Sequence, residues 1–349
     1  MKLYDITIEP LSPMGTVPKG DTLFGQFCWQ VAHDSKLADD GLSGVLQEYG
    51  NRPFVVFSSA FPKIESESQV RYYFPRPLHT VAGKGASQGG SRKSIIENRK
   101  LDRARKWMEV FGGKALDASS TSFLTDEAVG RILLESSGAC GGKTGVHSGI
   151  PGVPARAERP HNSINRMTGT TGSGTFAPYT TDVLYYLPGM KLAVFVLIDE
   201  SATDIDRVVC GLERIGMSGF GRDASTGMGR FRIDSAGPVE VASVDHADAM
   251  YALAPVVPEK GQYRNFFFTP FVRFGRHGDQ LASSRVPFKK PVVMADEGAV
   301  LVPGDKKQFE RPWLGTAVKN VSRVQPETVA QGYAPWLPIT LELSYDTGK

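Results

Sequence analysis

The sequence predicts an α+β protein whose strands and helices alternate around one long insertion. Residues 2–9 alternate apolar and polar side chains, as a half-buried strand does. Residues 192–198 form an unbroken apolar run, which is typical of a strand in mid-sheet. A helix is predicted over 203–215, where apolar residues recur at helical spacing. In chain order these elements predict a βαββαβ ferredoxin-like unit, with residues of about 62–182 inserted between its second and third strands.

The first module is predicted to span residues 1–238. Its first strand leads through a loop to a helix with Asp21 as N-cap, and residues 53–61 form the second strand. The helix has an apolar stripe that consists of Phe24, Phe27, Cys28 and Val31. Helices on one face of such a sheet would leave the other face free for a partner.

The insertion is predicted to have three parts. Residues 83–93 are polar, basic and low in complexity. Residues 95–111 are predicted to form an amphipathic helix. Its buried stripe would be Leu101, Ala104, Met108 and Phe111, opposite Arg99, Arg103 and Lys106. Residues 138–181 are rich in Gly, Thr, Pro and Arg without periodicity, which indicates a functional or disordered loop.

After the insertion, the helix over 203–215 is predicted to end at Gly216, and a glycine-rich loop over 219–230 leads to a strand with Phe231 and Ile233 facing inward. Residues 239–349 are predicted to form a second, degenerate module of the same class. Its short strands are predicted at 265–274, 290–295, 300–302 and 339–344.

The composition narrows the class of protein. The chain has 349 residues, of which 41% are hydrophobic and 22% charged, as in soluble globular proteins. No apolar run approaches the roughly 18–20 residues that span a bilayer, and residues 1–10 lack a signal-peptide pattern, so we expect a cytoplasmic protein without membrane contact. The three cysteines are widely spaced, which predicts neither a disulfide framework nor a metal site, and no cofactor is expected. A net charge of +3 is too small to indicate nucleic-acid binding by itself.

The glycine-rich loop is the most specific motif. Its glycines allow close approach of a partner and can direct consecutive N–H groups at an anion, and Arg222 and Arg230 flank it with guanidinium groups suited to phosphate. The other interpretation is a flexible connection. The candidate RNA-binding residues of this loop are Arg222, Ser225, Thr226, Gly227, Met228, Gly229 and Arg230.

A second polar segment covers residues 156–169. Arg side chains there could contact phosphates while Asn and Ser contact single-stranded bases, although a solvated loop with incidental arginines remains the alternative. Its candidates are Arg159, His161, Asn162, Arg166 and Thr168. Lys19, beside a helix N-terminus, and the pair Lys289 and Lys290 are weaker candidates.

Catalytic motifs are incomplete. The string over 137–144 has Ser137 where a phosphate-binding P-loop requires its first glycine. The histidines show no metal-ligand spacing, and only His161 stands among arginines as a candidate general base. The sequence therefore predicts a binding surface and not an enzyme.

Four strings in this order resemble a known family. They are Asp21–Gly25, the Asn162–Gly169 string NSINRMTG, the Gly219–Phe231 loop, and PFKKP at 287–291 with Glu297-Gly298. Together they resemble the RAMP-superfamily subunit that binds the 5′ handle of the crRNA in type III-A CRISPR (Csm) effector complexes. The resemblance implies two RRM-type ferredoxin-like modules that hold the repeat-derived 5′ tag. It also implies contacts with the large polymerase-like signalling subunit and with the backbone RAMP subunit, in antiviral defence.

Two other functions remain open. One is a metal-independent endoribonuclease of the same superfamily that matures crRNA, with His161 and either Arg159 or Arg166. The other is a protein-assembly scaffold that does not recognise RNA specifically. The family assigns no role to the basic stretch over 83–93.

Overall fold

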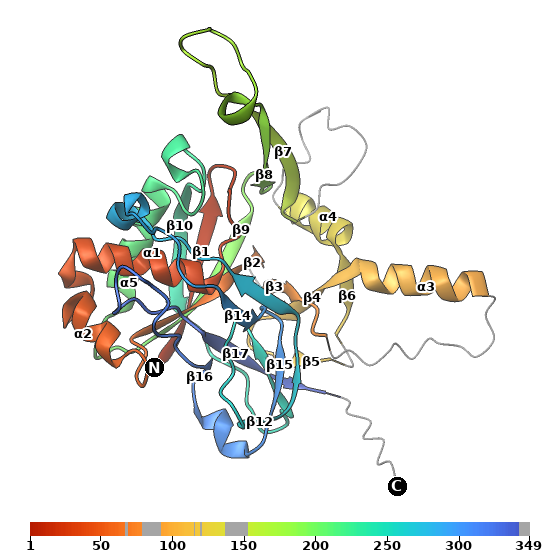
Figure 1. Ribbon diagram of the computed structural model, residues 1–349. Coiled ribbons are helices and arrows are strands. Elements are labelled where there is room, and N and C mark those ends of the chain that lie inside the picture. Colours follow the sequence, from red (N-terminus) through yellow and green to blue (C-terminus); the bar gives the residue numbers. More distant parts are fainter. Residues whose placement is uncertain (67–68, 79–91, 115, 119–120, 137–152, 342–349) are drawn as a thin grey trace.

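The computed structural model describes residues 1–66, 69–78, 92–114, 116–118, 121–136 and 153–341. They form an α+β body from which a hairpin and the helix α3 project in different directions (Figure 1). The α+β class predicted from the sequence is confirmed. No helix in these residues is both long and apolar enough to cross a bilayer, and no cluster of potential metal ligands occurs among them.

The first sheet has the strand order β10-β1-β9-β2-β3-β4-β6. Its first four members are the strands predicted for the βαββαβ unit: β1 (Lys2–Pro10), β2 (Val55–Glu65), β9 (Lys191–Ile198) and β10 (Phe231–Pro238). Helix α1 (Gly20–His33) connects β1 to β2, and α5 (Ile205–Ser218) connects β9 to β10. The pairs β1–β10, β1–β9 and β2–β9 are antiparallel, so the predicted order of connections holds here.

Helices α1 and α5 pack on this sheet through the predicted apolar stripes. Phe24 and Phe27 of α1, and Val208, Leu212 and Ile215 of α5, are at most 1% exposed. Burying a side chain of this size contributes roughly 1.5–3 kcal/mol. The predicted helix ends are wrong: the N-cap of α1 is Lys19 and not Asp21, and α5 ends at Gly219 and not Gly216. Gly216 instead permits close packing, because a Cβ there would lie 2.2 Å from the Phe231 carbonyl oxygen.

The second face of the sheet is not free, contrary to the prediction. Asp5 and Thr7 of β1 point to this face and are 6% and 0% exposed. Lys63 Nζ lies 2.8 Å from Asp5 Oδ2 and donates to Thr7 Oγ1 at 2.7 Å, and the Tyr72 hydroxyl donates to Asp5 at 2.8 Å. The inserted strand β3 (Val70–Pro75) supplies Tyr72, so part of the insertion covers the face that the sequence left open.

The insertion extends the sheet with β3, β4 (Arg105–Phe111) and β6 (Phe123–Thr125). The helix predicted over 95–111 is wrong in its second half, because α3 (Arg92–Ala104) ends where β4 begins. Pairing of β4 with β3 overrides the predicted helical pattern. Met108 is buried in β4, whereas Leu101, which was predicted to be buried in the helix, is 60% exposed. Residues 83–91 of the basic stretch, and the string over 137–144, lie outside the described residues.

The C-terminal region forms a second sheet of order β12-β15-β11-β17-β16. Its described residues, 239–341, contain no α-helix, which the degenerate-module prediction did not anticipate. Its strands are β11 (Ala249–Ala252), β12 (Tyr263–Phe267), β15 (Val300–Pro303), β16 (Trp313–Gly315) and β17 (Tyr333–Thr340). Strands β13 (Pro270–Arg273) and β14 (Val292–Ala295) pair separately. Tyr251, Val300 and Ile339 belong to the same apolar core as Ile6 of β1.

The remaining elements are short or lie in the projecting hairpin. They are α2 (Gly41–Glu48), β5 (Leu116–Asp117), α4 (Asp126–Ser136), β7 (Ala155–His161), β8 (Tyr179–Tyr185) and the 3-10 helices η1 (Ser35–Leu37), η3 (Gly174–Phe176), η4 (Ala224–Thr226), η5 (Asp279–Ser283) and η6 (Lys306–Glu310).

Candidate nucleic-acid interface

A hairpin arm, residues 155–185, projects from the body at the top of Figure 1. Strands β7 and β8 pair in register from Ala155–Tyr185 to His161–Tyr179. The sequence predicted no regular structure here, because both faces of the arm are mostly solvated and its strands lack an apolar alternation. A local turn closes the far end: Asn165 Oδ1 accepts from the Met167 N–H at 2.9 Å, and Gly169 has a φ of +68°.

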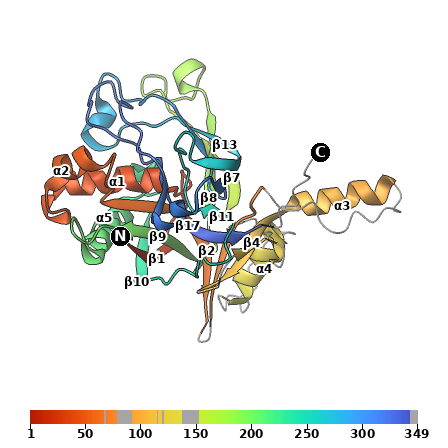
Figure 2. The same ribbon diagram turned by 90° about the horizontal axis from the view of Figure 1, so that it is seen from below.

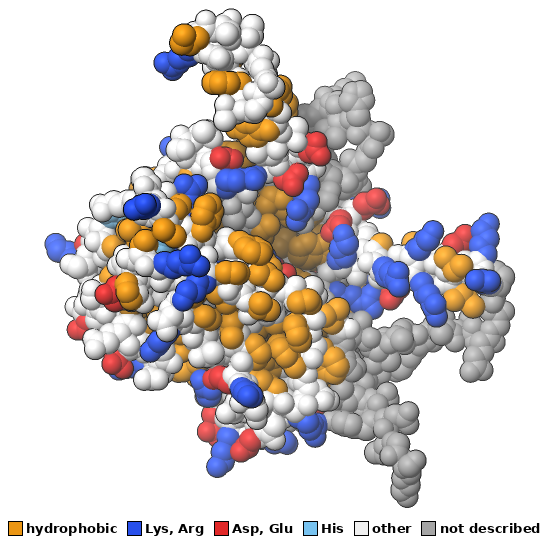
Figure 3. All heavy atoms as spheres, viewed as in Figure 1, with side chains coloured by type: hydrophobic (Ala, Val, Ile, Leu, Met, Phe, Trp, Pro, Cys, Tyr) orange, Lys and Arg blue, Asp and Glu red, His pale blue; other side chains and the backbone are white. Residues whose placement is uncertain are grey.

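The tip of the arm exposes apolar and basic side chains together. Met167 is 94% exposed and Ile164 62%, and Arg166 lies between them in sequence. Figure 3 shows hydrophobic and basic side chains at this tip. Arg159 and Arg166 have no ion-pair partner in the described part of the chain, and Asn162 and Thr168 are exposed. The second segment predicted from the sequence therefore forms one accessible surface on the arm.

His161 lies on the arm, and its ring makes two contacts there. Its Nε2 is 3.0 Å from Thr181 Oγ1, and its ring stacks on Tyr179 with a centroid distance of 5.2 Å. No carboxylate hydrogen-bonds this ring among the described residues. Tyr179, which is 53% exposed, adds an aromatic surface beside Arg159 that the sequence analysis missed. Its signal was the β-strand pattern YTTDVLY directly after the Gly-rich segment.

The glycine-rich loop lies against the base of the arm. Arg222 donates from its guanidinium to the Asp182 carbonyl oxygen on β8 and from its N–H to Thr16 Oγ1 at 3.0 Å. Arg230 donates to the Met217 carbonyl oxygen at 3.1 and 3.2 Å. A guanidinium has five N–H donors, so both arginines keep donors for a phosphate. The structure thus places the glycine-rich loop against β8 of the arm, next to the strand that carries Arg159.

Two details of the loop correct the sequence analysis. Met228 is 2% exposed and packs inside, so its side chain is not available to RNA. The N–H groups of Thr226, Gly227, Met228 and Gly229 all donate to backbone carbonyls, so they do not form the predicted anion-binding row. Ser225, Thr226 and Gly227 remain exposed at the loop's end.

The two candidate glycines of the loop differ in their surroundings. A Cβ on Gly229 would lie 2.1 Å from the Phe220 carbonyl oxygen, whereas a Cβ on Gly227 would meet nothing within 4 Å. Both have positive φ, +72° and +90°. Gly229 is therefore required by packing, and only Gly227 presents open backbone to a partner.

Lys19 belongs to an internal ionic cluster, the clasp, which comprises Lys19, Asp21, Phe271, Arg273, Asp296 and Glu297. Lys19 is 9% exposed, and its ammonium contacts Asp296 and both carboxylate oxygens of Glu297, at 2.7 and 2.6 Å. Arg273 binds Asp21 through two hydrogen bonds of 2.5 and 2.8 Å. The Phe271 ring lies 4.7 Å from each cation. This burial argues against the predicted RNA contact of Lys19.

The clasp also shifts two carboxyl pKa values. Burial raises the pKa of Glu297 to about 7, against the opposing effect of the Lys19 charge. The pKa of Asp296 is lowered: burial alone would raise it, but hydrogen bonding with Glu297 and the Lys19 charge outweigh this effect. One ammonium faces two buried carboxylates here, so proton uptake by one of them relieves excess negative charge.

Lys289 and Lys290 point to different environments. Lys289 is half-buried, and this burial lowers its pKa, whereas Lys290 is exposed. Lys290 lies near an aromatic ribbon that the sequence analysis missed, namely Phe274, Arg276 and Phe288. Phe274 is 76% exposed and Phe288 63%, and the Arg276 guanidinium lies 5.8 Å from the Phe288 ring. Exposed rings next to cations are a common platform for single-stranded nucleic acids.

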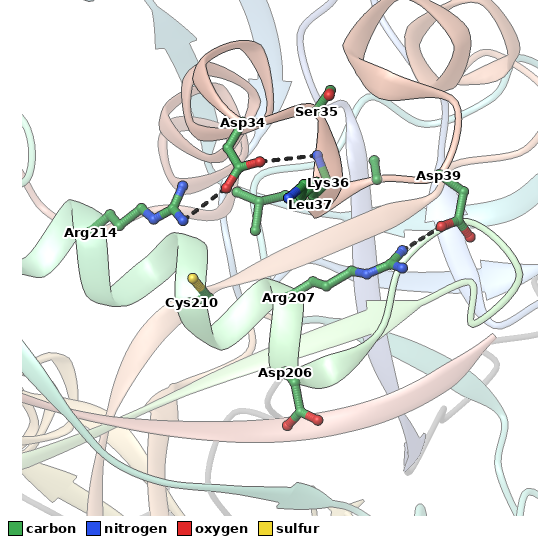
Figure 4. A pocket seen from close by; sticks show the side chains of 10 residues that line it. Asp34, Ser35, Lys36, Leu37, Asp39, Asp206, Arg207, Cys210 and Arg214 are labelled. Carbon is green, nitrogen blue, oxygen red and sulfur yellow. Dashed lines mark hydrogen bonds and ion pairs between the residues drawn. The ribbon is translucent and has the colours of Figure 1, made fainter.

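A broad depression of about 680 Å³ lies away from these surfaces, between η1 and α5 (Figure 4). Two arginines line it, but Arg214 binds Asp34 at 2.9 Å and Arg207 binds Asp39 at 2.6 Å. The charges of both arginines are thus already paired within the protein.

The β10-β1-β9-β2 order and the glycine-rich loop after α5 belong to an α+β fold that solved structures share. The particular likeness is to Csm4 subunits. A chain from the crystal structure of a Csm1-Csm4 cassette in complex with pppApA aligns with a TM-score of 0.51 and 15% identity, covering 98% of this chain and 99% of that chain. A chain from the Csm3-Csm4 subcomplex of the type III-A CRISPR-Cas interference complex aligns with a TM-score of 0.50 and 13% identity, covering 97% and 99%.

A cassette in complex with cA4 gives a TM-score of 0.51 at 15% identity, over 97% of this chain and 98% of that chain. No family model and no curated protein matches the sequence. At these identities the comparisons establish the fold, and they agree with the resemblance found in the sequence.

Proposed function

We propose that this chain is a non-catalytic crRNA-binding subunit of a type III-A CRISPR effector complex, which holds the repeat-derived 5′ tag of the crRNA. The observation that carries the proposal is the junction of the glycine-rich loop with the base of the hairpin arm through Arg222 and Asp182. Around this junction lie the guanidinium groups of Arg222, which also pairs with Asp223 at 3.4 Å, and of Arg230, together with exposed hydroxyl groups and open glycine backbone. Such groups suit phosphates and sugars.

The arm adds surfaces for bases. Tyr179 and Met167 are exposed next to Arg159 and Arg166, and stacking of bases on such side chains does not depend on a duplex groove. The proposal treats the β10-β1-β9-β2 part as the first ferredoxin-like module and the β12–β17 sheet as a degenerate second module, with the aromatic ribbon as a further RNA contact.

The similar structures and the exposed apolar surface of this chain support a proposal about protein partners. Those structures are described as Csm1-Csm4 and Csm3-Csm4 assemblies, so we infer that this chain joins a large polymerase-like subunit to a backbone RAMP subunit, in the cytoplasm. Hydrophobic side chains gather on the face shown in Figure 3. The exposed apolar residues of the chain include Phe268, Val272 and Val293, at 39%, 41% and 67%. Apolar surface of this kind is typical of protein contacts.

Incubation of the chain with a labelled repeat RNA tests the proposal. Specific capture without cleavage supports it, cleavage at one bond indicates the endoribonuclease, and absence of capture leaves the scaffold. The double variant Arg159→Gln/Arg166→Gln should lose at least tenfold in affinity, because two charge-assisted phosphate contacts are removed. Lys306→Gln/Lys307→Gln, which removes two exposed charges elsewhere, is the control and should change affinity less than threefold.

A further inference from the structure

Helix α3 projects from the body as a separate arm. Figures 1 and 2 both show it pointing away from the sheets, and none of its residues is buried. With 13 residues it is about 20 Å long, given a rise of about 1.5 Å per residue. A helix of this length is marginal in water without tertiary contacts, so its exposed state needs a physical reason.

One face of α3 is strongly basic. Arg92, Arg99 and Arg103 occur at i, i+7 and i+11, and Lys93 and Lys100 run beside them with the same seven-residue spacing. All five side chains are exposed, and none has an ion-pair partner in the part of the chain that the structure describes. Some exposed arginines elsewhere do form ion pairs, for example Arg232 with Glu9 and Arg311 with Glu259.

The base of the helix is fixed to the body, which gives this basic face a defined direction. Arg76 donates to Asp102 through its carbonyl oxygen and Oδ1, both at 2.9 Å. The Arg76 guanidinium also lies 4.5 Å from the Phe123 ring. The carboxylate of Asp102 is therefore engaged with the body, and of the helix's two carboxylates only Glu97 remains near its five cations.

The apolar residues of α3 do not form a docking stripe. Ile95, Ile96 and Leu101 are 41%, 45% and 60% exposed, and no two of them are separated by three or four residues. Protein interfaces are depleted of charge at their centres and enriched in aromatic residues, whereas interfaces with nucleic acid are strongly basic. A membrane-surface helix would need a continuous apolar face, which α3 lacks.

We propose that the basic face of α3 binds the phosphate backbone of single-stranded RNA without reading its sequence. This surface is separate from the tag-binding junction and does not depend on it. The cations near each end of the basic face would neutralise phosphates along the strand, and the affinity would come from release of counterions. The long, fixed helix would extend the reach of the protein along an RNA strand beyond the body.

The test uses the full chain and fluorescence anisotropy with a 40-nucleotide single-stranded RNA that contains no repeat sequence, at several salt concentrations. Arg99→Gln/Lys100→Gln/Arg103→Gln should lower affinity at least tenfold and reduce the slope of log K against log salt by about 2, at about 0.7 per lost contact. The matched control, Lys260→Gln/Lys306→Gln/Lys307→Gln, removes the same charge from exposed sites outside α3 and should lower affinity less than threefold.

A charge-conserving variant, Arg99→Lys/Arg103→Lys, should bind within threefold of the original chain, and circular dichroism verifies that helix content is retained. If the α3 triple variant and the control triple variant lower RNA affinity equally, the inference is overturned. The α3 face would then be a contact for an acidic protein. The repeat-RNA assay separates the two proposals, because the α3 variant should keep its discrimination between tag and scrambled tag, whereas the arm variant should bind the tag at least tenfold more weakly.

Discussion

The clasp and the hairpin arm both contain cations that the sequence places in loops, but their surroundings are opposite. In the clasp, Lys19 is 9% exposed and contacts two carboxylates. On the arm, Arg159 and Arg166 are exposed and have no ion-pair partner among the described residues. The comparison shows that a basic residue beside a loop acquires its role from the carboxylates and the solvent around it, and not from its sequence motif.

The largest expected effect concerns the clasp. Lys19→Met should lower the free energy of unfolding by about 3–5 kcal/mol, because Asp296 and Glu297 would remain buried without a compensating charge. Denaturant unfolding measures it, with the exposed Lys290→Met as control and an expected change below about 0.5 kcal/mol. A loss below about 1 kcal/mol for Lys19→Met would mean that water reaches the clasp.

Gly229 and Gly227 allow the same comparison, between a packed and an exposed position, within one loop. Gly229→Val should lower the free energy of unfolding by about 3 kcal/mol or more, because the new Cβ overlaps the Phe220 backbone. Gly227→Val should lower it by only about 1–2 kcal/mol, from strain at positive φ. The sequence alone predicts similar, small losses for both. Similar losses measured by thermal unfolding would show that the loop is looser than the structure indicates.

The pH dependence of the clasp is a smaller effect. Because burial raises the pKa of Glu297 from 4.5 to about 7, the folded state binds this proton more tightly than the unfolded state. Its contribution is therefore present below about pH 4.5 and is lost as the pH rises towards 7. Glu297→Gln should match the original chain at pH 5 and exceed its stability at pH 8 by about 1–3 kcal/mol.

Parallel denaturant titrations at both pH values provide the measurement. A stability difference between the Glu297→Gln variant and the original chain that stays constant from pH 5 to pH 8 would show that Glu297 is already ionised, and the raised pKa would be wrong.

The smallest effect on stability is expected on the arm. Arg159→Gln/Arg166→Gln should change the free energy of unfolding by less than about 0.5 kcal/mol, because neither guanidinium has a partner to lose. The same variant should reduce the slope of log K against log salt for tag RNA by about 1.4, at about 0.7 per contact. A stability loss above about 1 kcal/mol would place these arginines in the fold and not in the interface.

Sequence patterns predicted the elements whose periodicity comes from one buried face. The strands β1 and β9 and the helix α5 are of this kind, since their apolar residues alternate, run together or recur at helical spacing. Sequence patterns failed where pairing with a distant strand determines the secondary structure. Met108 fits a helical stripe but lies in β4, because β4 pairs with β3. The order of the C-terminal strands rests on long-range pairs such as β11 with β17, which local patterns do not encode.

The candidate site was predictable in its residue types and not in its geometry. Arg222, Arg230 and the arm residues were identified as potential RNA contacts from donor chemistry alone. The inward direction of Met228 and Lys289 could not be predicted, because each depends on which neighbouring segment covers it. Tyr179, Phe274 and Phe288 were missed because local sequence patterns do not show which aromatic side chains stay exposed, and only the folded chain shows this.

The most direct test of the central claim is photo-crosslinking of the full chain to repeat RNA with 4-thiouridine in the tag, followed by mass spectrometry of the peptides. The account predicts crosslinks to the arm over 159–168 and to the loop over 222–230, which contacts β8 of the arm through Arg222 and Asp182. It predicts none to Lys19 or Met228, whose side chains are buried. Crosslinks confined to other surfaces, with the arm and loop unlabelled, would contradict it.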